Sequence, residues 1–132
     1  MAVVAAGAML TGAAAAYAHA AARPVSKFTV AVGNTYTTGT ITWYGRSVTV
    51  KGTEKSVDDF SCRGTRAYTL NSRKHLLATR KAKYNACGGT QTFNFTVPAN
   101  VRGGAAVVRV CLHGEDPFGG WSKTLKCKLY GR

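Results

Sequence analysis

Hydrophobic and polar residues alternate with a period of two along much of the chain after residue 26. Eight segments show this alternation or are rich in threonine, valine and aromatic residues: 27–32, 37–44, 47–50, 66–70, 79–86, 91–97, 107–112 and 124–130. Such segments are typical of strands with one buried face, and none keeps the apolar spacing of a helix beyond two turns. The pattern predicts an all-β domain, a single small antiparallel β-sandwich of about 7–8 strands. A small closed barrel is the alternative.

The first 22 residues differ from the rest, because they are mostly alanine and other small or apolar residues and include no Asp, Glu, Lys or Arg. Cleavage after Ala18, Ala20 or Ala22 satisfies the A-x-A rule of signal peptidases. We therefore expect residues 1–20 to be a signal peptide and residues 27–132 to form the domain of a secreted, extracellular protein. The alternative is a retained membrane anchor, which alanine disfavours because it is only weakly apolar. No later apolar run is long enough to span a bilayer, so we expect no membrane span in the mature form.

Four cysteines follow this segment: Cys62, Cys87, Cys111 and Cys127. In a small exported chain they indicate two disulfides rather than free thiols. The nearest two are 16 positions apart, whereas zinc ligands usually lie about two to four positions apart. We therefore expect no metal site, and nothing in the sequence indicates another cofactor.

Four cysteines allow three pairings. The midpoint of Cys111 and Cys127 lies in a Gly-Gly turn, and the midpoint of Cys62 and Cys87 lies in the polar break 72–75. Each of these pairs would close a hairpin, and we favour this pairing. Cys87–Cys111 is the main competitor, since the two predicted strands between these cysteines could form a hairpin of their own.

The favoured pairing raises a problem of strand register. Direct pairing about the midpoint of Cys62 and Cys87 puts Tyr68 opposite Lys81, which mixes the core face with the solvent face. A β-bulge near Asn85–Gly89 would repair the register.

The chain has 18 Lys and Arg against 5 Asp and Glu, a net charge of +13. Such an imbalance attracts polyanions, so we expect non-specific partners among anionic polymers, either of the cell envelope or nucleic acid. The candidate polyanion-binding residues lie on the two arms and the connection of one predicted hairpin, where they would form a single positive projection: Arg73, Lys74, Arg80, Lys81 and Lys83. The alternative is that these cations only keep the surface soluble and protect edge strands from aggregation.

No catalytic motif is present, so we expect a monomeric binding protein and not an enzyme. A weaker alternative is a small secreted nuclease. It would use His113 with Glu115 and Asp116, or His75, since a base, an acid and a cation suit phosphodiester cleavage. A further alternative is a protein-binding module such as a peptidase inhibitor with Arg102 as its anchor, because a rigid, disulfide-bonded loop docks with little loss of entropy.

The two tryptophans are expected in different environments. Trp43 alternates with Ile41 and is expected in the core. Trp121 follows a Gly-Gly turn, where it either packs over the end of a hairpin or stands exposed as a sugar or protein anchor.

The stretch from Gly39 to Thr53, GTITWYGRSVTVKGT, resembles a GTxxWYxRSVxxxG-type strand pair of small secreted actinobacterial proteins, in which the pair follows a signal peptide. Residues 91–97, QTFNFTV, resemble a later strand of the same proteins. The resemblance covers residues 36–110 and implies a β-sandwich. It carries no activity over to this chain.

Overall fold

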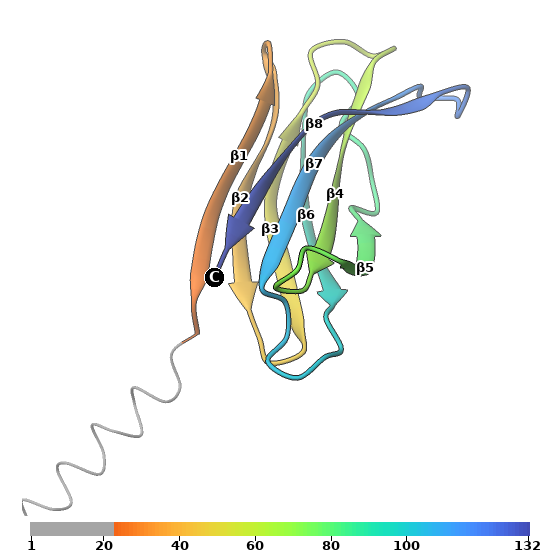
Figure 1. The fold of residues 1–132 in the computed structure, drawn as a ribbon. Helices are drawn as coiled ribbons and strands as arrows, with labels where there is room; N and C mark the ends of the chain where they lie inside the picture. Colours follow the sequence, from red (N-terminus) through yellow and green to blue (C-terminus); the bar gives the residue numbers. More distant parts are fainter. Residues whose placement is uncertain (1–22) are drawn as a thin grey trace, which may run out of the picture.

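The computed structural model describes residues 23–132, which form eight strands and no helix (Figure 1). The strands are β1 (Val25–Val32), β2 (Thr35–Trp43), β3 (Ser47–Lys55), β4 (Cys62–Leu70), β5 (Leu76–Lys81), β6 (Thr90–Pro98), β7 (Val107–Glu115) and β8 (Ser122–Gly131). All eight overlap the segments predicted from the alternation. The largest difference is at β5, because the expected strand 79–86 begins earlier and ends at Lys81. The predicted signal peptide, residues 1–20, lies outside the described residues.

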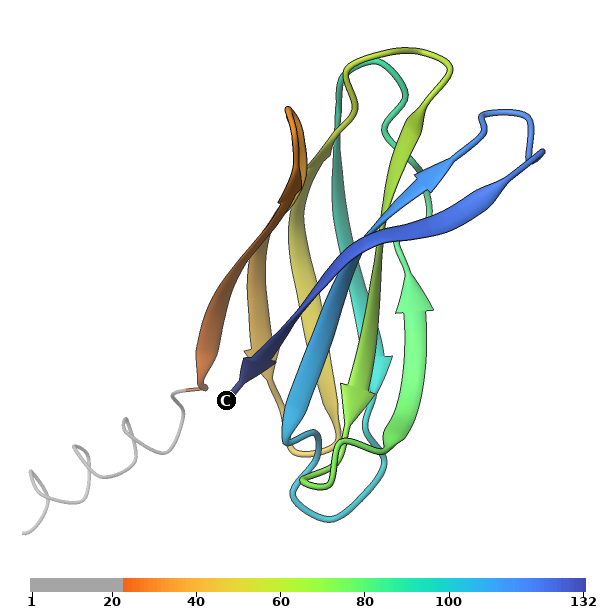
Figure 2. The same ribbon diagram turned by 45° about the horizontal axis from the view of Figure 1, so that its top comes forward.

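The strands form two four-stranded sheets, in the orders β1-β2-β3-β6 and β5-β4-β7-β8. All neighbouring strands are antiparallel, and the two sheets pack face to face (Figures 1 and 2). The prediction of an antiparallel β-sandwich is confirmed, and the closed barrel is wrong. Strand β6 pairs with β3, while β7 pairs with β4 and β8, so the β6–β7 hairpin of the competing cysteine pairing does not form.

The core consists of the inward side chains of both sheets, as the alternation predicts. Ile41, Val48 and Val50 of the first sheet are fully buried, as is Val110 of the second. Trp43 is 1% exposed, and its indole N–H donates to the Ser26 hydroxyl at 2.9 Å. Burial of each such large side chain contributes about 1.5–3 kcal/mol, and burial explains why these positions are apolar.

Strands β2 and β3 approach closely where Gly39 faces Gly52. A Cβ on Gly39 would lie 1.9 Å from the Lys51 carbonyl oxygen, and one on Gly52 would lie 2.0 Å from the Thr38 carbonyl oxygen. The local backbone therefore requires glycine at both positions.

Two disulfides join the cysteines in the favoured pairing, Cys62–Cys87 and Cys111–Cys127. Cys111 and Cys127 are direct cross-strand partners in β7 and β8. Two disulfides in a small domain are consistent with an extracellular location. No helix that could cross a bilayer occurs in residues 23–132.

The register of the β4–β5 hairpin avoids the conflict expected from the cysteine midpoint. Tyr68 lies opposite Thr79, not Lys81, because the four residues 82–85 face only Gly64 and Thr65 of β4, which moves the register by two positions. Ala82 N still donates to the Thr65 carbonyl oxygen, residues 83–85 leave the ladder, and pairing resumes at the isolated bridge between Arg63 and Ala86. The irregularity expected near 85–89 thus begins a few residues earlier, and a second one lies near the turn, where Leu77 of β5 is an extra residue opposite the step from Thr69 to Leu70.

Candidate functional site

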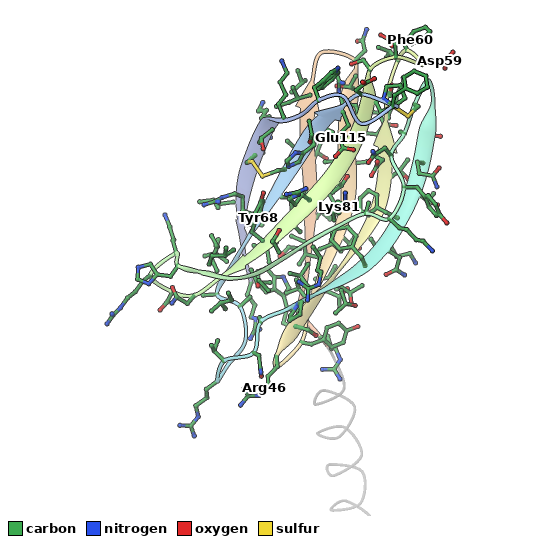
Figure 3. The ribbon with its side chains drawn as sticks, turned by 90° about the vertical axis from the view of Figure 1, so that its right-hand side faces the viewer. Arg46, Asp59, Phe60, Tyr68, Lys81 and Glu115 are labelled. Carbon is green, nitrogen blue, oxygen red and sulfur yellow. A yellow bond between two sulfur atoms is a disulfide. The ribbon has the colours of Figure 1, made fainter. Side chains whose placement is uncertain are left out.

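The acidic side chains are confined to one end of the sandwich, whereas cations occur at both ends and along the strands. Successive strands alternate in direction, so the β2–β3, β4–β5 and β6–β7 connections and both ends of the described chain lie at one end (Figures 1 and 2). This basic end carries six cations and no Asp or Glu: Arg23, Arg46, Arg73, Lys74, Arg102 and Arg132. All 5 acidic residues of the chain lie at or near the opposite, acidic end: Glu54, Asp58, Asp59, Glu115 and Asp116. In Figure 3, Asp59 and Glu115 mark the acidic end and Arg46 marks the basic end.

Contacts between loops hold the basic end together as one surface. Arg46 Nη1 donates to Asn100 Oδ1 at 3.1 Å, which joins the β2–β3 turn to the β6–β7 loop. Arg132 Nη2 donates to the Tyr44 carbonyl oxygen at 3.2 Å, and the guanidinium lies 5.5 Å from the centre of the Trp43 ring. These arginines are exposed but anchored, so their charges are presented in a defined arrangement.

A cavity of about 310 Å³ opens between the loops of the basic end. Arg102, Arg132 and the Asn71–Ser72 turn line it together with the backbone of residues 103–106. Gly103 and Gly104 have φ values of 82° and 73°, which L side chains rarely adopt, and they form the sharp bend of this loop. The cavity therefore has cations at its rim and small residues on its wall.

The structure does not gather the five candidate polyanion-binding residues into one projection. Arg73 and Lys74 lie in the β4–β5 turn at the basic end, whereas Arg80 and Lys81 lie at the far end of β5 and Lys83 lies beyond it. A six-residue strand separates the two groups by roughly 17 Å. The hairpin that carries them is present, but its length divides the set.

A second group of cations lies on the outer face of the sheet β5-β4-β7-β8. Arg66 of β4, Lys81 of β5 and Arg109 of β7 alternate with inward residues of their strands. The Arg109 guanidinium lies 5.6 Å from the centre of the Tyr68 ring, within the range of a cation–π contact. Figure 3 shows Tyr68 and Lys81 between the two ends of the molecule. A cleft of about 290 Å³ on this face is lined by Arg66, Thr79, Arg80 and Lys81.

The side chains of His113 and Glu115 line a small depression on the same outer face, nearer the acidic end. His113 is 6% exposed, and burial, assisted by the positive charge of Arg66, lowers its pKa. Glu115 accepts a hydrogen bond from Asn85 Nδ2. The depression leaves no space for a water molecule, so no substrate phosphate fits beside His113 in this arrangement.

The other residues of the nuclease alternative lie elsewhere. His75 lies in the β4–β5 turn at the basic end, and Asp116 accepts a hydrogen bond from Gly120 N at 2.9 Å within the β7–β8 turn. The structure thus brings His113 and Glu115 together but places the second histidine at the opposite end of the sheet.

Glu54 is the buried acid of the molecule. It lies on the inward face of β3, is 0% exposed, and accepts a hydrogen bond at Oε1 from the Thr65 hydroxyl at 3.0 Å. Its Oε2 has no hydrogen-bond partner among the described residues. Burial raises the pKa of Glu54 to about 7, and the hydrogen bond from Thr65 opposes this effect only in part. The carboxyl therefore titrates near neutrality, inside the sandwich.

Exposed aromatic side chains gather at the acidic end, on three different connections. They are Phe60 of the β3–β4 loop, Tyr84 of the β5–β6 loop, and Phe118 and Trp121 of the β7–β8 turn. Phe60 is 76% and Phe118 is 86% exposed. Trp121 is partly packed and partly exposed. One edge of its ring lies against Gly114, while 43% of the residue remains accessible to solvent. Exposed apolar groups concentrated at one end of a monomer mark a candidate interaction surface.

Comparison with protein-family models, curated proteins and solved structures found no match. The resemblance to secreted actinobacterial proteins therefore stays a prediction. Residues 23–132 contain no group of three or more His, Cys, Asp or Glu side chains placed to hold a metal ion.

The basic end is not apparent as a surface when cations are grouped by their closeness along the chain. The signal that could have found it is the order of the strands. In an antiparallel sandwich every second connection lies at the same end, so Arg46, Arg73 and Arg102, from three alternate connections, belong together. Glu54 was also missed, although it continues the inward alternation of Val48 and Val50.

Proposed function

We propose that this protein is a secreted, non-catalytic module that binds anionic polymers of the cell envelope or the extracellular medium through its basic end. The observation that carries the proposal is the division of charge, since six cations share an end that has no Asp or Glu. A cluster of this kind raises the local concentration of polyanions and releases their counterions on binding.

The kind of cation also supports the proposal. Five of the six basic-end residues are arginines, whose planar guanidinium matches the geometry of phosphate and sulfate groups. Loops that are already held in place lose less conformational entropy on binding than mobile ones. The two disulfides and the predicted signal peptide support a secreted protein.

The test compares two triple glutamine variants for binding to heparin and to RNA over a range of salt concentrations. The first variant replaces three exposed basic-end residues: Arg73, Lys74 and Arg102. The matched control replaces three exposed lysines on strands: Lys27, Lys51 and Lys128. We expect the first variant to flatten the slope of log K against log salt by about two to three. The slope reflects the number of counterions that the polyanion releases on binding, and this number falls with each cation removed from the protein.

The control variant should change the slope much less than the basic-end variant. Equal flattening by both variants would mean that the protein attracts polyanions only through its overall charge. No binding of either polymer by the wild type at physiological salt would reject the proposed function.

A second candidate function is recognition of a protein, and the exposed aromatics of the acidic end favour it. Aromatic side chains dominate the binding energy of many protein interfaces. The loops that carry Phe60 and Tyr84 are joined by the Cys62–Cys87 disulfide at their base, and Gly88 N donates to the Ser56 hydroxyl at 3.1 Å. Rigid loops with exposed apolar tips are suited to docking.

Titration of two peptidases tests this candidate as an inhibitor. An inhibitor that uses Phe118 should block a chymotrypsin-like enzyme, whereas one that uses Arg102 should block a trypsin-like enzyme. Phe118→Ala or Arg102→Gln should then abolish the respective inhibition. Absence of stoichiometric inhibition of both enzymes would remove peptidase inhibition from consideration.

A further inference from the structure

Arg66 and Lys81 are direct cross-strand partners in β4 and β5. Ala82 N donates to the Thr65 carbonyl oxygen at 2.9 Å, so the adjacent pair of Arg66 and Lys81 occupies a non-hydrogen-bonded position of the ladder. The Cα atoms of such a pair lie about 4.5 Å apart, and their side chains are close. Like charges directly opposite each other destabilise a sheet. The structure thus holds two cations where opposite charges or apolar groups would be more stable.

No carboxylate compensates this pair. The cleft of about 290 Å³ beside it is lined only by Arg66, Thr79, Arg80 and Lys81. Glu115 is the only acidic residue on the outer face of this sheet, and it accepts a hydrogen bond from Asn85. On its other side, Arg66 is next to Cys111, which belongs to a disulfide and carries no charge.

Two polar atoms in the same region make no hydrogen bond within the described residues. One is the buried hydroxyl oxygen of Thr79, a residue that lines the cleft. The other is Nδ1 of His113, which lies in the adjoining depression with Arg66 and Lys81. Buried polar groups are normally paired, so both atoms require an explanation. The positive charge of Arg66 also contributes to the lowered pKa of His113, which agrees with an excess of positive charge here.

We infer that the cleft between Arg66 and Lys81 binds a phosphate or sulfate group. Two facing cations, with Arg80 beside them, match a group that spreads negative charge over several oxygens. Such a group would relieve the repulsion within the pair. That this cleft is a subsite for an anionic polymer rests on the proposed function. It specifies that the polymer must carry phosphate or sulfate groups.

Thermal unfolding tests the site without any polymer. Wild type, Lys81→Gln and the control Lys51→Gln are melted in sodium phosphate, sodium sulfate and sodium chloride at matched ionic strength. Phosphate and sulfate stabilise folded proteins in general, so they should raise the Tm of all three proteins above the value in chloride, but by a clearly larger amount in wild type and control than in Lys81→Gln. In dilute chloride, Lys81→Gln should melt about 1–5 °C above wild type, because the like-charge pair is gone. Lys51 lies opposite Thr40, so the control should stay within about 1 °C of wild type.

An increase in Tm with phosphate or sulfate that is as large in Lys81→Gln as in wild type would overturn the inference. So would a Lys81→Gln variant that melts below wild type in dilute chloride, since the pair would then be stabilising. The two measurements together separate a binding site from a merely basic surface.

Two short anionic ligands, tripolyphosphate and a heparin hexasaccharide, identify the source of the group. In calorimetric titrations, Arg66→Gln should bind the preferred ligand about tenfold more weakly than wild type. If both ligands bind wild type and Arg66→Gln equally well, the cleft is not a subsite, although the proposed function stands. If long polymers fail to bind wild type while phosphate still raises the Tm of wild type more than that of Lys81→Gln, the proposed function is rejected and the phosphate site is retained.

Discussion

The buried carboxyl of Glu54 makes the stability of the sandwich depend on pH, and Glu54→Gln is expected to remove that dependence. In the folded protein, burial raises the pKa of Glu54 from its usual 4.5 to about 7. In the unfolded chain the carboxyl loses its proton near the usual value. Between these pH values the folded state therefore binds one more proton than the unfolded state, and the free energy of unfolding falls as the pH rises.

The difference between the two pKa values sets the size of the effect. Each pH unit between 4.5 and about 7 removes about 1.4 kcal/mol, so the whole range removes about 3 kcal/mol. This is a large share of the 5–15 kcal/mol that typically separates a folded domain of roughly this size from its unfolded chain. Glutamine keeps an oxygen for the Thr65 hydroxyl and carries no charge, so it mimics the protonated acid.

We expect Glu54→Gln to match wild type within about 1 kcal/mol at pH 5 and to exceed it by about 3 kcal/mol at pH 8. Urea unfolding at both pH values, followed by the fluorescence of the buried Trp43, measures the difference. His113 adds a slope of opposite sign, because its lowered pKa removes stability as the pH falls below 6.5, but it is present in both proteins. Asp59→Asn controls for the loss of one exposed negative charge at the same end.

The reasoning would be refuted if Glu54→Gln and wild type differed by the same amount at pH 5 and pH 8. It would also be refuted if the variant were less stable than wild type at pH 8. Either result would mean that the ionised carboxyl is solvated or paired, and not simply buried.

Further predictions concern a disulfide, a histidine and a glycine. Replacing Cys111 and Cys127 by alanine should lower the free energy of unfolding in urea by about 3 kcal/mol, since their separation is 16 residues, and mass spectrometry of the intact protein should detect no free thiol. His113→Gln should gain Tm relative to wild type between pH 7 and pH 5, because it lacks the imidazole whose protonation costs stability as the pH falls, and a Tm difference that is the same at both pH values would contradict the burial argument. Gly39→Ala should cost more than about 2 kcal/mol because its Cβ would lie 1.9 Å from a carbonyl oxygen. Gly45→Ala, with nothing within 4 Å of its Cβ, is the control, and equal costs would contradict the close approach.

The fold was predictable from the sequence because one physical rule, burial of alternate side chains, acts along every strand. The cysteine pairing was predictable for a related reason, since each disulfide closes a hairpin whose turn lies midway between the two cysteines. The boundaries of β5 were not predictable. This strand lies at the edge of its sheet, and residues 83–85 leave the ladder before Ala86 pairs with Arg63. Such a shift depends on the whole sheet and leaves no local pattern.

The candidate sites were less accessible from the sequence, because each depends on contacts between distant segments. The pair of Arg66 and Lys81 exists only in the observed register of β4 and β5, and a shift of one residue would separate these side chains onto opposite faces. The inward position of Glu54 follows from extending the alternation of β3 by two steps beyond Val50, but its raised pKa depends on the facing sheet. The expected strand 47–50 ends at Val50 and so does not include Glu54.

Turns at both ends are closed by hydrogen bonds from backbone N–H groups to a side-chain oxygen, but the residue that supplies this oxygen differs between the two ends. At the acidic end, Asp58 Oδ1 accepts hydrogen bonds from two backbone N–H groups of its own turn, each at 2.7 Å, and Asp116 accepts from Gly120 N at 2.9 Å. At the basic end, Asn71 Oδ1 accepts from Arg73 N and His75 N, each at 2.9 Å. Aspartate and asparagine both suit such turns. The basic end therefore has the neutral residue at a position where the fold would also accept an acid.

Asn71→Asp tests whether this neutrality serves binding. The carboxylate keeps both hydrogen bonds of the turn, so the free energy of unfolding should change by less than about 1 kcal/mol. The new negative charge lies beside the cavity that Arg102 and Arg132 line, so affinity for heparin or RNA should fall and the salt slope should flatten by about one. Asp58→Asn is the matched control, because it changes the net charge by the same amount in the opposite direction at the far end. If polymer affinity follows net charge alone, Asn71→Asp should weaken binding by the same factor by which Asp58→Asn strengthens it. A clearly larger effect at position 71 is expected if the basic end is the binding surface, and equal effects at the two ends would contradict it.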